Sequence, residues 1–337
     1  MVFAPVDAGA SASAENCARA AWELWRTTRQ DSLQAAGMHA LTEGRNPATT
    51  EIDRLPTLDM LRLINLEDTR VTRAVGSQLA QIAEAVDRIA ERMRRGGRMI
   101  YAGAGTSGRI GVLDASEIPP TYGTSPELVV ALIAGGDIAV RSSLEGVEDD
   151  TAAGMRAVQE LSTGPEDSLI GIAASGRTPY VIGAMEEARR RGALTVSVAC
   201  NSPAPMEDLA DVVITPLVGA EVITGSTRMK AGTAQKLVLN MLSTCVMVRL
   251  GKTFSNLMVD MQATNTKLRG RARRIVAQVA GVSEHQAGEI LDAAGGELKT
   301  AIVMARSGAT PEQARQRLSR SGGVVRAALE PEGAHDQ

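Results

Sequence analysis

The sequence predicts an α/β fold: a doubly wound, five-stranded parallel sheet flanked by helices, followed by a small C-terminal helical subdomain. Five short β-like runs alternate with helical segments, and the runs VVALI and LIGI lack the polar alternation of a half-exposed sheet, which is typical of parallel strands buried on both faces. Beyond residue 267 no strand pattern occurs, and glycines divide the chain into short helical segments. With 337 residues and 44% hydrophobic composition, the chain has enough apolar side chains for about two folded units.

The first quarter of the chain precedes the sheet. Residues 1–40 form an atypical extension that is rich in Ala and Ser at first and helical later, and Met38 is a candidate for the true start. Residues 57–95 carry apolar side chains at helical spacing with no interrupting proline. We therefore expect one or two amphipathic helices to lead into the first strand.

The predicted strands follow in order, each bounded by a Gly, Ser or Pro loop. They lie at residues 99–102, 128–133, 169–173, 194–199 and 212–215. Helices are predicted at residues 108–116, 150–161, 179–191 and 226–250. This alternation indicates parallel strands joined by helices that cover the two faces of the sheet.

The C-terminal region is predicted to be helical throughout. Glycines break residues 275–330 into about four short helices, with Ser283 and Thr310 as N-caps and Pro311 in a first turn. The predicted organisation is an extension at 1–40, a main domain with an N-terminal helical segment at 41–270, a helical subdomain at 271–330 and a tail at 331–337.

Composition limits the function classes. Lys and Arg number 36 against 39 Asp and Glu, and a net charge of −3 does not suit a protein that coats nucleic acid or an anionic membrane. Aromatic residues make up only 2%, so hydrogen bonds rather than stacking must recognise a small ligand. Cys17, Cys200 and Cys245 are far apart and the three histidines are scattered, so we expect no disulfide framework, no metal, no cofactor and a reducing cytoplasmic location. No apolar stretch reaches the roughly 18 residues of a membrane span.

Hydroxyl-rich glycine loops follow the first and third predicted strands. The first carries Thr106 and Ser107 within the run GAGTSG, and the second carries Ser175, Gly176 and Thr178. Backbone N–H groups and hydroxyls at helix N-termini bind anions, so the pair predicts a phosphate site at the carboxyl edge of the sheet. Taken alone, the first loop is also compatible with a plain tight turn, because a GxGxxG match is a weak signal.

A third polar segment opens the predicted helix at 226–250. Ser226, Thr227 and Lys230 place two hydroxyls and a cation near its start. These side chains are candidates for contacts to the same ligand. The alternative interpretation is an ordinary capped helix whose cation faces solvent.

Two acidic positions are candidates for proton transfer. Glu117 follows the helix after the first loop, Glu148 follows the second strand, and we expect both segments to return to the same crevice. A pair of carboxyl groups, one protonated and one ionised, can act as general acid and general base. The alternative for residues 145–150 is a charged helix start, where acidic side chains are favoured.

Five segments, taken in order, resemble the N-acetylmuramic acid 6-phosphate etherase family, whose fold is the sugar isomerase (SIS) type. They are LTEGRNP at 41–47, GAGTSGR at 103–109, LDASEIPPT at 113–121, EGVED at 145–149 and GSTRMKAGT at 225–233. The resemblance covers roughly residues 41–330 and is more specific than the SIS fold alone.

The resemblance implies a carbon–oxygen lyase that cleaves the D-lactyl ether of N-acetylmuramic acid 6-phosphate and releases N-acetylglucosamine 6-phosphate and D-lactate, in the recycling of cell-wall amino sugars. Glu117 matches the acid that protonates the departing lactate oxygen, and Glu148 matches the second carboxylate, assigned here as the base at C2; the two roles are exchangeable at this stage. It also implies a homodimer with sites near the subunit interface. The residues implied to hold the phosphate are Thr106, Ser107, Ser175, Gly176 and Thr178, and those implied to border the sugar are Ser226, Thr227 and Lys230.

Other functions would use part of the same pattern. A regulatory sensor, like the related glucokinase regulatory protein, would keep the phosphate loops and need neither glutamate. A sugar-phosphate aldose–ketose isomerase would place a base beside C2 but would release no lactate. A transcriptional regulator would need an N-terminal DNA-binding unit, and residues 1–56 carry no such pattern.

Overall fold

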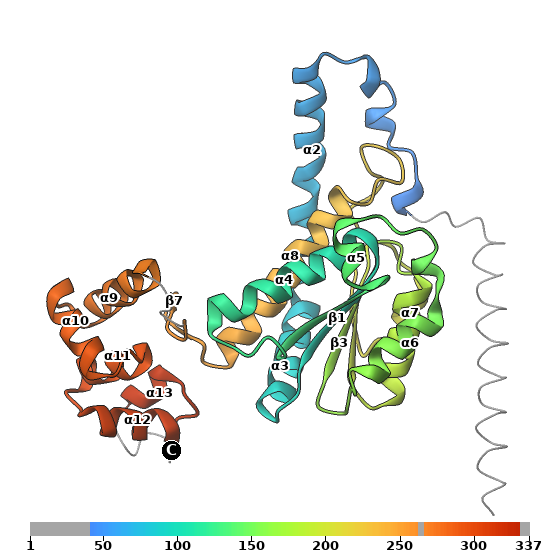
Figure 1. Ribbon diagram of the computed structural model, residues 1–337. Helices are drawn as coiled ribbons and strands as arrows, with labels where there is room; N and C mark the ends of the chain where they lie inside the picture. Colours follow the sequence, from blue (N-terminus) through green and yellow to red (C-terminus); the bar gives the residue numbers. More distant parts are fainter. Residues whose placement is uncertain (1–40, 262–265, 331–337) are drawn as a thin grey trace, which may run out of the picture.

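The computed structural model describes residues 41–261 and 266–330 (Figure 1). The predictions made for residues 1–40 and 331–337 lie outside the described residues. The predicted helical stretch at 57–95 forms two helices, α2 (Thr57–Gly76) and α3 (Leu79–Arg94), which are separated at Ser77 and Gln78. Figure 1 shows α2 projecting from the body of the molecule, whereas α3 packs beside the sheet.

All five predicted strands are present and parallel. They are β1 (Met99–Gly103), β2 (Val129–Ile133), β3 (Ser168–Ile172), β4 (Leu194–Val198) and β5 (Val212–Ile214). Their order is β2-β1-β3-β4-β5, so β1 is flanked by the two strands that follow it in the sequence. This order confirms the doubly wound sheet and creates a switch point between β1 and β3, where open α/β sheets bind ligands.

Helices cover both faces of the sheet. On one face, α3, α4 (Gly105–Tyr122) and α8 (Lys230–Arg249) form a core with the apolar side chains of β1, β3, β4 and β5. On the other face, α6 (Thr151–Glu160) and α7 (Pro179–Arg190) form a second core around β1 and β3. β1, β3 and β4 are buried along their whole length, so apolar side chains occur on both faces of these strands and the polar Thr195 and Ser197 of β4 are buried with them.

Three helix predictions need correction. The helix predicted at 108–116 begins earlier and ends later, because α4 starts directly after β1 and continues through Pro119 and Pro120. The helix predicted at 226–250 begins at Lys230, because residues 225–229 form tight turns. A short helix that was not predicted, α5 (Gly136–Arg141), follows β2.

The C-terminal region has a hydrophobic core of its own, away from the sheet (Figure 1). It begins with a small antiparallel pair that was not predicted, β6 (Thr253–Phe254) and β7 (Leu257–Met258). Its helices are α9 (Thr266–Ala280), α10 (Glu284–Ala293), α11 (Leu298–Ser307), α12 (Pro311–Arg320) and α13 (Val325–Leu329). The predicted caps are confirmed: Ser283 and Thr310 each form a reciprocal capping box. The boundary predicted at residue 270 falls inside α9.

Candidate active site

The two hydroxyl-rich loops lie side by side at the switch point of the sheet. β1 and β3 pair in register up to Gly103 and Ile172, so the loops that follow them leave the same edge of the sheet. Each loop runs directly into a helix, α4 after β1 and α7 after β3. Both loops therefore lie at the same edge of the sheet, and a shared ligand crevice between them stays a prediction.

The glycines of the first loop allow α4 to approach β1 closely. A Cβ atom at Gly103 would lie 2.7 Å from the backbone nitrogen of Gly108, and a Cβ atom at Gly108 would lie 2.8 Å from the carbonyl oxygen of Gly103. This contact places Thr106 and Ser107 in the first turn of α4, where backbone N–H groups lack partners within the helix. Ser107 is 7% exposed, and its hydroxyl donates a hydrogen bond to Oε1 of Gln235 at 2.9 Å.

The second loop is held in a tight conformation. Gly176 has φ +67°, and a Cβ atom there would lie 2.5 Å from that of Ala204, so no other residue fits this turn. The hydroxyl of Ser175 accepts a hydrogen bond from the backbone N–H of Arg177 at 3.2 Å. Thr178 is the N-cap of α7 and, within the described structure, its side chain makes no capping bond. Both hydroxyls thus border the N-terminus of α7.

Asn201 joins the second loop to the N-terminal segment. Its side-chain nitrogen donates to the carbonyl oxygen of Ala174 at 2.8 Å and to the hydroxyl of Thr42 at 2.9 Å. Its side-chain oxygen accepts from the backbone N–H of Thr42 at 3.2 Å. The LTEGRNP segment therefore packs against the base of the candidate site.

The third polar segment meets the first loop, but Lys230 is turned away from it. A Cβ atom at Gly232 would lie 3.4 Å from the carbonyl oxygen of Thr227 and 3.3 Å from the methyl group of Thr106, so the start of α8 packs on the start of α4. Ser226 and Thr227 lie in the turns just before α8. The segment is thus close enough to share a ligand with the first loop.

Lys230 is fully buried and forms an ion pair with Glu67 of α2 at 2.6 Å. The carboxylate of Glu221 accepts the backbone N–H groups of Lys230 and Ala231 at 3.0 and 2.9 Å, so this carboxylate occupies the N-terminus of α8. The prediction that Lys230 borders the sugar does not agree with this geometry, because the ammonium group is fully buried and cannot reach a ligand at the loops. The lysine instead anchors the third segment to α2.

The two predicted catalytic glutamates lie on different elements, and both are exposed. Glu148 lies in the short 3-10 helix Val147–Asp149, which packs against α7, and it is exposed. Glu117 is exposed on α4, ten residues beyond Ser107 and hence about 15 Å farther along the helix axis. That both acidic segments return to one crevice therefore stays a prediction.

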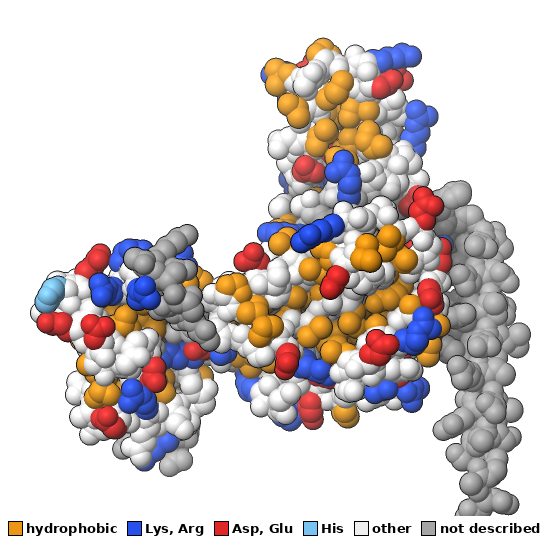
Figure 2. All heavy atoms as spheres, in the orientation of Figure 1, with side chains coloured by type: hydrophobic (Ala, Val, Ile, Leu, Met, Phe, Trp, Pro, Cys, Tyr) orange, Lys and Arg blue, Asp and Glu red, His pale blue; other side chains and the backbone are white. Residues whose placement is uncertain are grey.

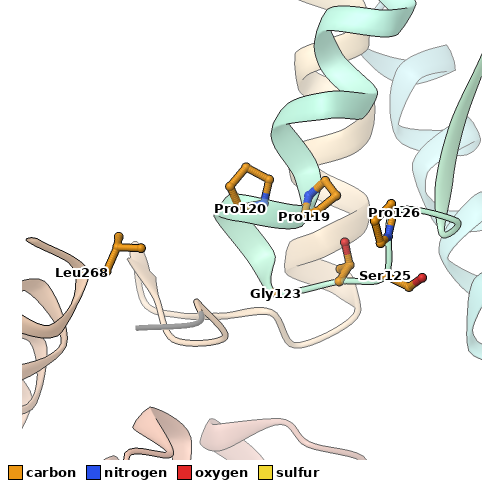
Figure 3. Close-up of a pocket in the computed structure, with 7 residues that line it drawn as sticks. Pro119, Pro120, Gly123, Ser125, Pro126 and Leu268 are labelled. Carbon is orange, nitrogen blue, oxygen red and sulfur yellow. The ribbon is translucent and has the colours of Figure 1, made fainter. Parts of the chain in front are cut away.

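A surface pocket of 490 Å³ lies at the far end of α4 (Figure 3). Its lining consists of Pro119, Pro120, Gly123, Thr124, Ser125, Pro126 and Leu268. Leu268 belongs to α9, so the pocket lies where the helical subdomain faces the end of α4. None of the predicted phosphate-binding residues lines it.

Sequence reasoning missed three buried polar residues around the loops: Glu67, Asn201 and Gln235. Glu67 interrupts the apolar stripe of α2, an amphipathic helix, and this interruption was a usable signal. Gln235 carried no such signal, because α8 is apolar on most of its sides. Asn201 carried no comparable signal, because it lies in the loop after β4.

Within residues 41–261 and 266–330, no three His, Cys, Asp or Glu side chains are grouped so that they could hold a metal ion. None of the helices in these ranges is long and apolar enough to cross a membrane.

The fold and the loops define the chain as a SIS-domain protein. The SIS domain model matches residues 144–244, and the model of the glucokinase regulatory protein N-terminal SIS domain matches residues 81–189. A phosphoheptose isomerase structure from Francisella tularensis is also similar, at 17% identity and a TM-score of 0.45, over 57% of this chain and 98% of that chain.

Curated relatives define the family more narrowly. N-acetylmuramic acid 6-phosphate etherase 1 of Vibrio cholerae is 56% identical over 87% of this chain and 97% of its own length. The N-acetylmuramic acid 6-phosphate etherase of Cutibacterium acnes is 55% identical over 86% of this chain and 96% of its own length. The chain belongs to the N-acetylmuramic acid 6-phosphate etherase family.

Proposed function

We propose that this chain cleaves the D-lactyl ether of N-acetylmuramic acid 6-phosphate and releases N-acetylglucosamine 6-phosphate and D-lactate. The observation that carries this proposal is the pair of Ser/Thr loops at the β1/β3 switch point in a chain that is 53–56% identical to curated etherases. The reaction would serve the recycling of cell-wall amino sugars. We place it in the cytoplasm, where phosphorylated sugars are retained and cysteines stay reduced.

The phosphate site is proposed at the two loops. Thr106 and Ser107 would bind one side of the phosphate and Ser175, Gly176 and Thr178 the other, through hydroxyls and the free N–H groups of the first turns of α4 and α7. The N-termini of the two helices would favour the negative charge of the phosphate. Ser226 and Thr227 would border the sugar, since their segment packs on Thr106.

The proposed chemistry is an elimination followed by addition of water. In the open-chain sugar, the C1 aldehyde acidifies the hydrogen at C2. A carboxylate removes this proton, a C2–C3 double bond forms, and the bond between C3 and the lactyl oxygen breaks as a second carboxyl group protonates that oxygen. Water then adds its oxygen to C3, and a proton returns to C2.

Glu148 is assigned as the base and Glu117 as the acid. This assignment is supported by the neighbour of Glu148, because the side chain of Val147 lies 3.5 Å from where a Cβ atom of Gly135 would be, just beyond the carboxyl end of β2. The sequence of proton transfers balances with these two carboxyl groups and water. It requires no metal and no nicotinamide.

A homodimer would bring Glu117 to this site. Because Glu117 lies about 15 Å along α4 from Ser107, we propose that it acts in the site of the partner subunit. The exposed leucines of α2 support association, and Figure 2 shows hydrophobic side chains gathered over that projecting helix. These leucines are Leu58, Leu61 and Leu66.

The experiment that tests the proposal measures which product takes up an oxygen atom from water. The protein is incubated with N-acetylmuramic acid 6-phosphate in ¹⁸O-labelled water, and both products are analysed by mass spectrometry. Elimination and addition predict one ¹⁸O at C3 of the sugar and none in D-lactate. An isomerase would exchange the C2 hydrogen with solvent and release no lactate, and a sensor would bind the sugar without either change.

A further inference from the structure

The hydroxyl of Ser107 donates its only proton to another side chain of the protein. Its hydroxyl donates to Oε1 of Gln235 at 2.9 Å, and both side chains are buried, at 7% and 1% exposure. A hydroxyl has one proton to donate, and a phosphate oxygen can only accept. In this arrangement Ser107 therefore cannot donate to a bound phosphate.

Only one of the two polar atoms in the side-chain amide of Gln235 forms a hydrogen bond. Its Oε1 accepts from Ser107, whereas its Nε2 is buried and has no hydrogen-bond partner among the described residues. A buried N–H group without a partner is costly, and native structures rarely leave one in place without a reason. The unused donor lies on the same planar amide as the oxygen that binds Ser107.

The packing keeps this pair at the crevice. Gln235 lies one turn beyond Gly232 on α8, and a Cβ atom at Gly232 would lie 3.3 Å from the methyl group of Thr106. The start of α8 is thus pressed against the first turn of α4. The packing of these two helices holds Ser107 and Gln235 next to each other.

We propose that Gln235 is a positioning residue that sets the direction of the Ser107 hydrogen bond. When phosphate binds, the amide turns over: Nε2 donates to Oγ of Ser107, and the hydroxyl proton is freed for a phosphate oxygen. Glutamine suits this role because one side chain offers both a donor and an acceptor. The inference rests on the proposed function only in placing a phosphate beside Ser107.

A double-mutant cycle tests this role. Gln235→Met keeps the side-chain length and removes both polar groups, and Ser107→Ala removes the hydroxyl that Gln235 is proposed to orient. Affinity for N-acetylglucosamine 6-phosphate is measured by calorimetry. We expect Gln235→Met to weaken binding about tenfold in the wild-type background and less than about twofold in the Ser107→Ala background.

Two further variants separate positioning from packing. Gln235→Glu retains an oxygen that can hold the Ser107 proton but lacks the N–H group, so we expect it to bind at least as weakly as Gln235→Met. Ser243→Ala removes a buried hydroxyl farther along α8 that donates to Asp114 at 3.2 Å, and we expect unchanged affinity. In steady-state assays, the Gln235 variants should raise KM while kcat stays within about threefold.

The outcomes are distinct from those of the proposed function. The etherase activity is tested by D-lactate release from the wild-type protein. The double-mutant cycle compares affinities for N-acetylglucosamine 6-phosphate and needs no turnover. Equal losses from Gln235→Met in both backgrounds, or wild-type affinity in folded Gln235→Glu, would overturn the positioning role.

Discussion

Nζ of Lys230 lies 2.6 Å from Oε2 of Glu67, and both side chains are almost completely buried. The same carboxylate oxygen accepts from the side-chain nitrogen of Asn46 at 2.9 Å. Burial opposes ionisation of Glu67, but the hydrogen bonds from Lys230 and Asn46, with the charges of Lys230 and Arg70, lower its pKa below the ordinary value. The pair therefore fastens α2, α8 and the N-terminal segment at one point beneath the candidate site.

Breaking this pair should be strongly destabilising. Lys230→Met leaves an unpaired buried carboxylate, so we expect the free energy of unfolding to fall by about 3–5 kcal/mol in urea titrations. Replacing both residues, as Lys230→Met with Glu67→Leu, should recover most of that loss. Arg54→Ala, which breaks the exposed pair with Glu51, serves as the control and should cost less than about 1 kcal/mol. A Lys230→Met protein as stable as that control would show that the pair is not the anchor described.

The close contact of α4 with β1 predicts a difference between two glycines. At Gly108, an added Cβ atom would lie 2.6 Å from the side chain of Ile133 and 2.8 Å from the carbonyl oxygen of Gly103. We expect Gly108→Ala to destabilise the protein by about 1–3 kcal/mol and to weaken binding of sugar phosphates, because it displaces the first turn of α4. At Gly76 an added Cβ atom meets nothing within 4 Å, so Gly76→Ala should be neutral or stabilising by up to about 1 kcal/mol. Equal effects of the two substitutions, measured by thermal unfolding and calorimetry, would contradict this explanation.

Glu187 should make stability depend on acid pH. Hydrogen bonds from Arg190 act against burial, and together with Arg191 they lower the pKa of this carboxyl from 4.5 to about 2. Because the folded-state pKa is depressed, the stabilisation is present above about pH 4.5 and is lost as the pH falls toward about 2.

Glu187→Gln should remove that dependence. Between about pH 6 and pH 3, the wild type should lose on the order of 1–2 kcal/mol more unfolding free energy than the variant. Glu166→Gln, at an exposed pair with Arg95, is the matched control and should follow the wild-type curve. If Glu187→Gln also follows the wild-type curve, the ion pairs of Glu187 with the two arginines do not cause the loss of stability at acid pH.

The position of Glu117 along α4, about 15 Å from Ser107, makes a prediction about mixed dimers. Glu117→Ala and Glu148→Ala homodimers should each be inactive, since each site lacks one carboxyl group. If Glu117 acts in the partner's site, a purified heterodimer of the two variants contains one site with both groups and one with neither. We expect it to recover about half of the wild-type activity. An inactive heterodimer that still binds sugar phosphate would place both glutamates in the site of one chain.

The sequence predicted the sheet well because each of its strands is a short apolar run bounded by turn residues, a pattern that depends on local chemistry. The pairing of Ser107 with Gln235 could not be predicted in the same way. These residues lie 128 positions apart, and only the packing of α4 on α8 brings them together. Lys230 was misplaced for a related reason: a cation at a helix start has the same local pattern whether it faces a ligand or a buried Glu67.

The central claim is tested most directly by D-lactate release from N-acetylmuramic acid 6-phosphate, measured with a coupled dehydrogenase and no added metal or cofactor. We expect release by the wild type, and a loss of about 10²–10⁴-fold in Glu117→Gln and in Glu148→Gln, with affinity for N-acetylglucosamine 6-phosphate largely retained. Absence of D-lactate from a folded wild type that binds the sugar phosphate would contradict the etherase assignment. Full activity in either folded glutamine variant would contradict the role given to that carboxyl group.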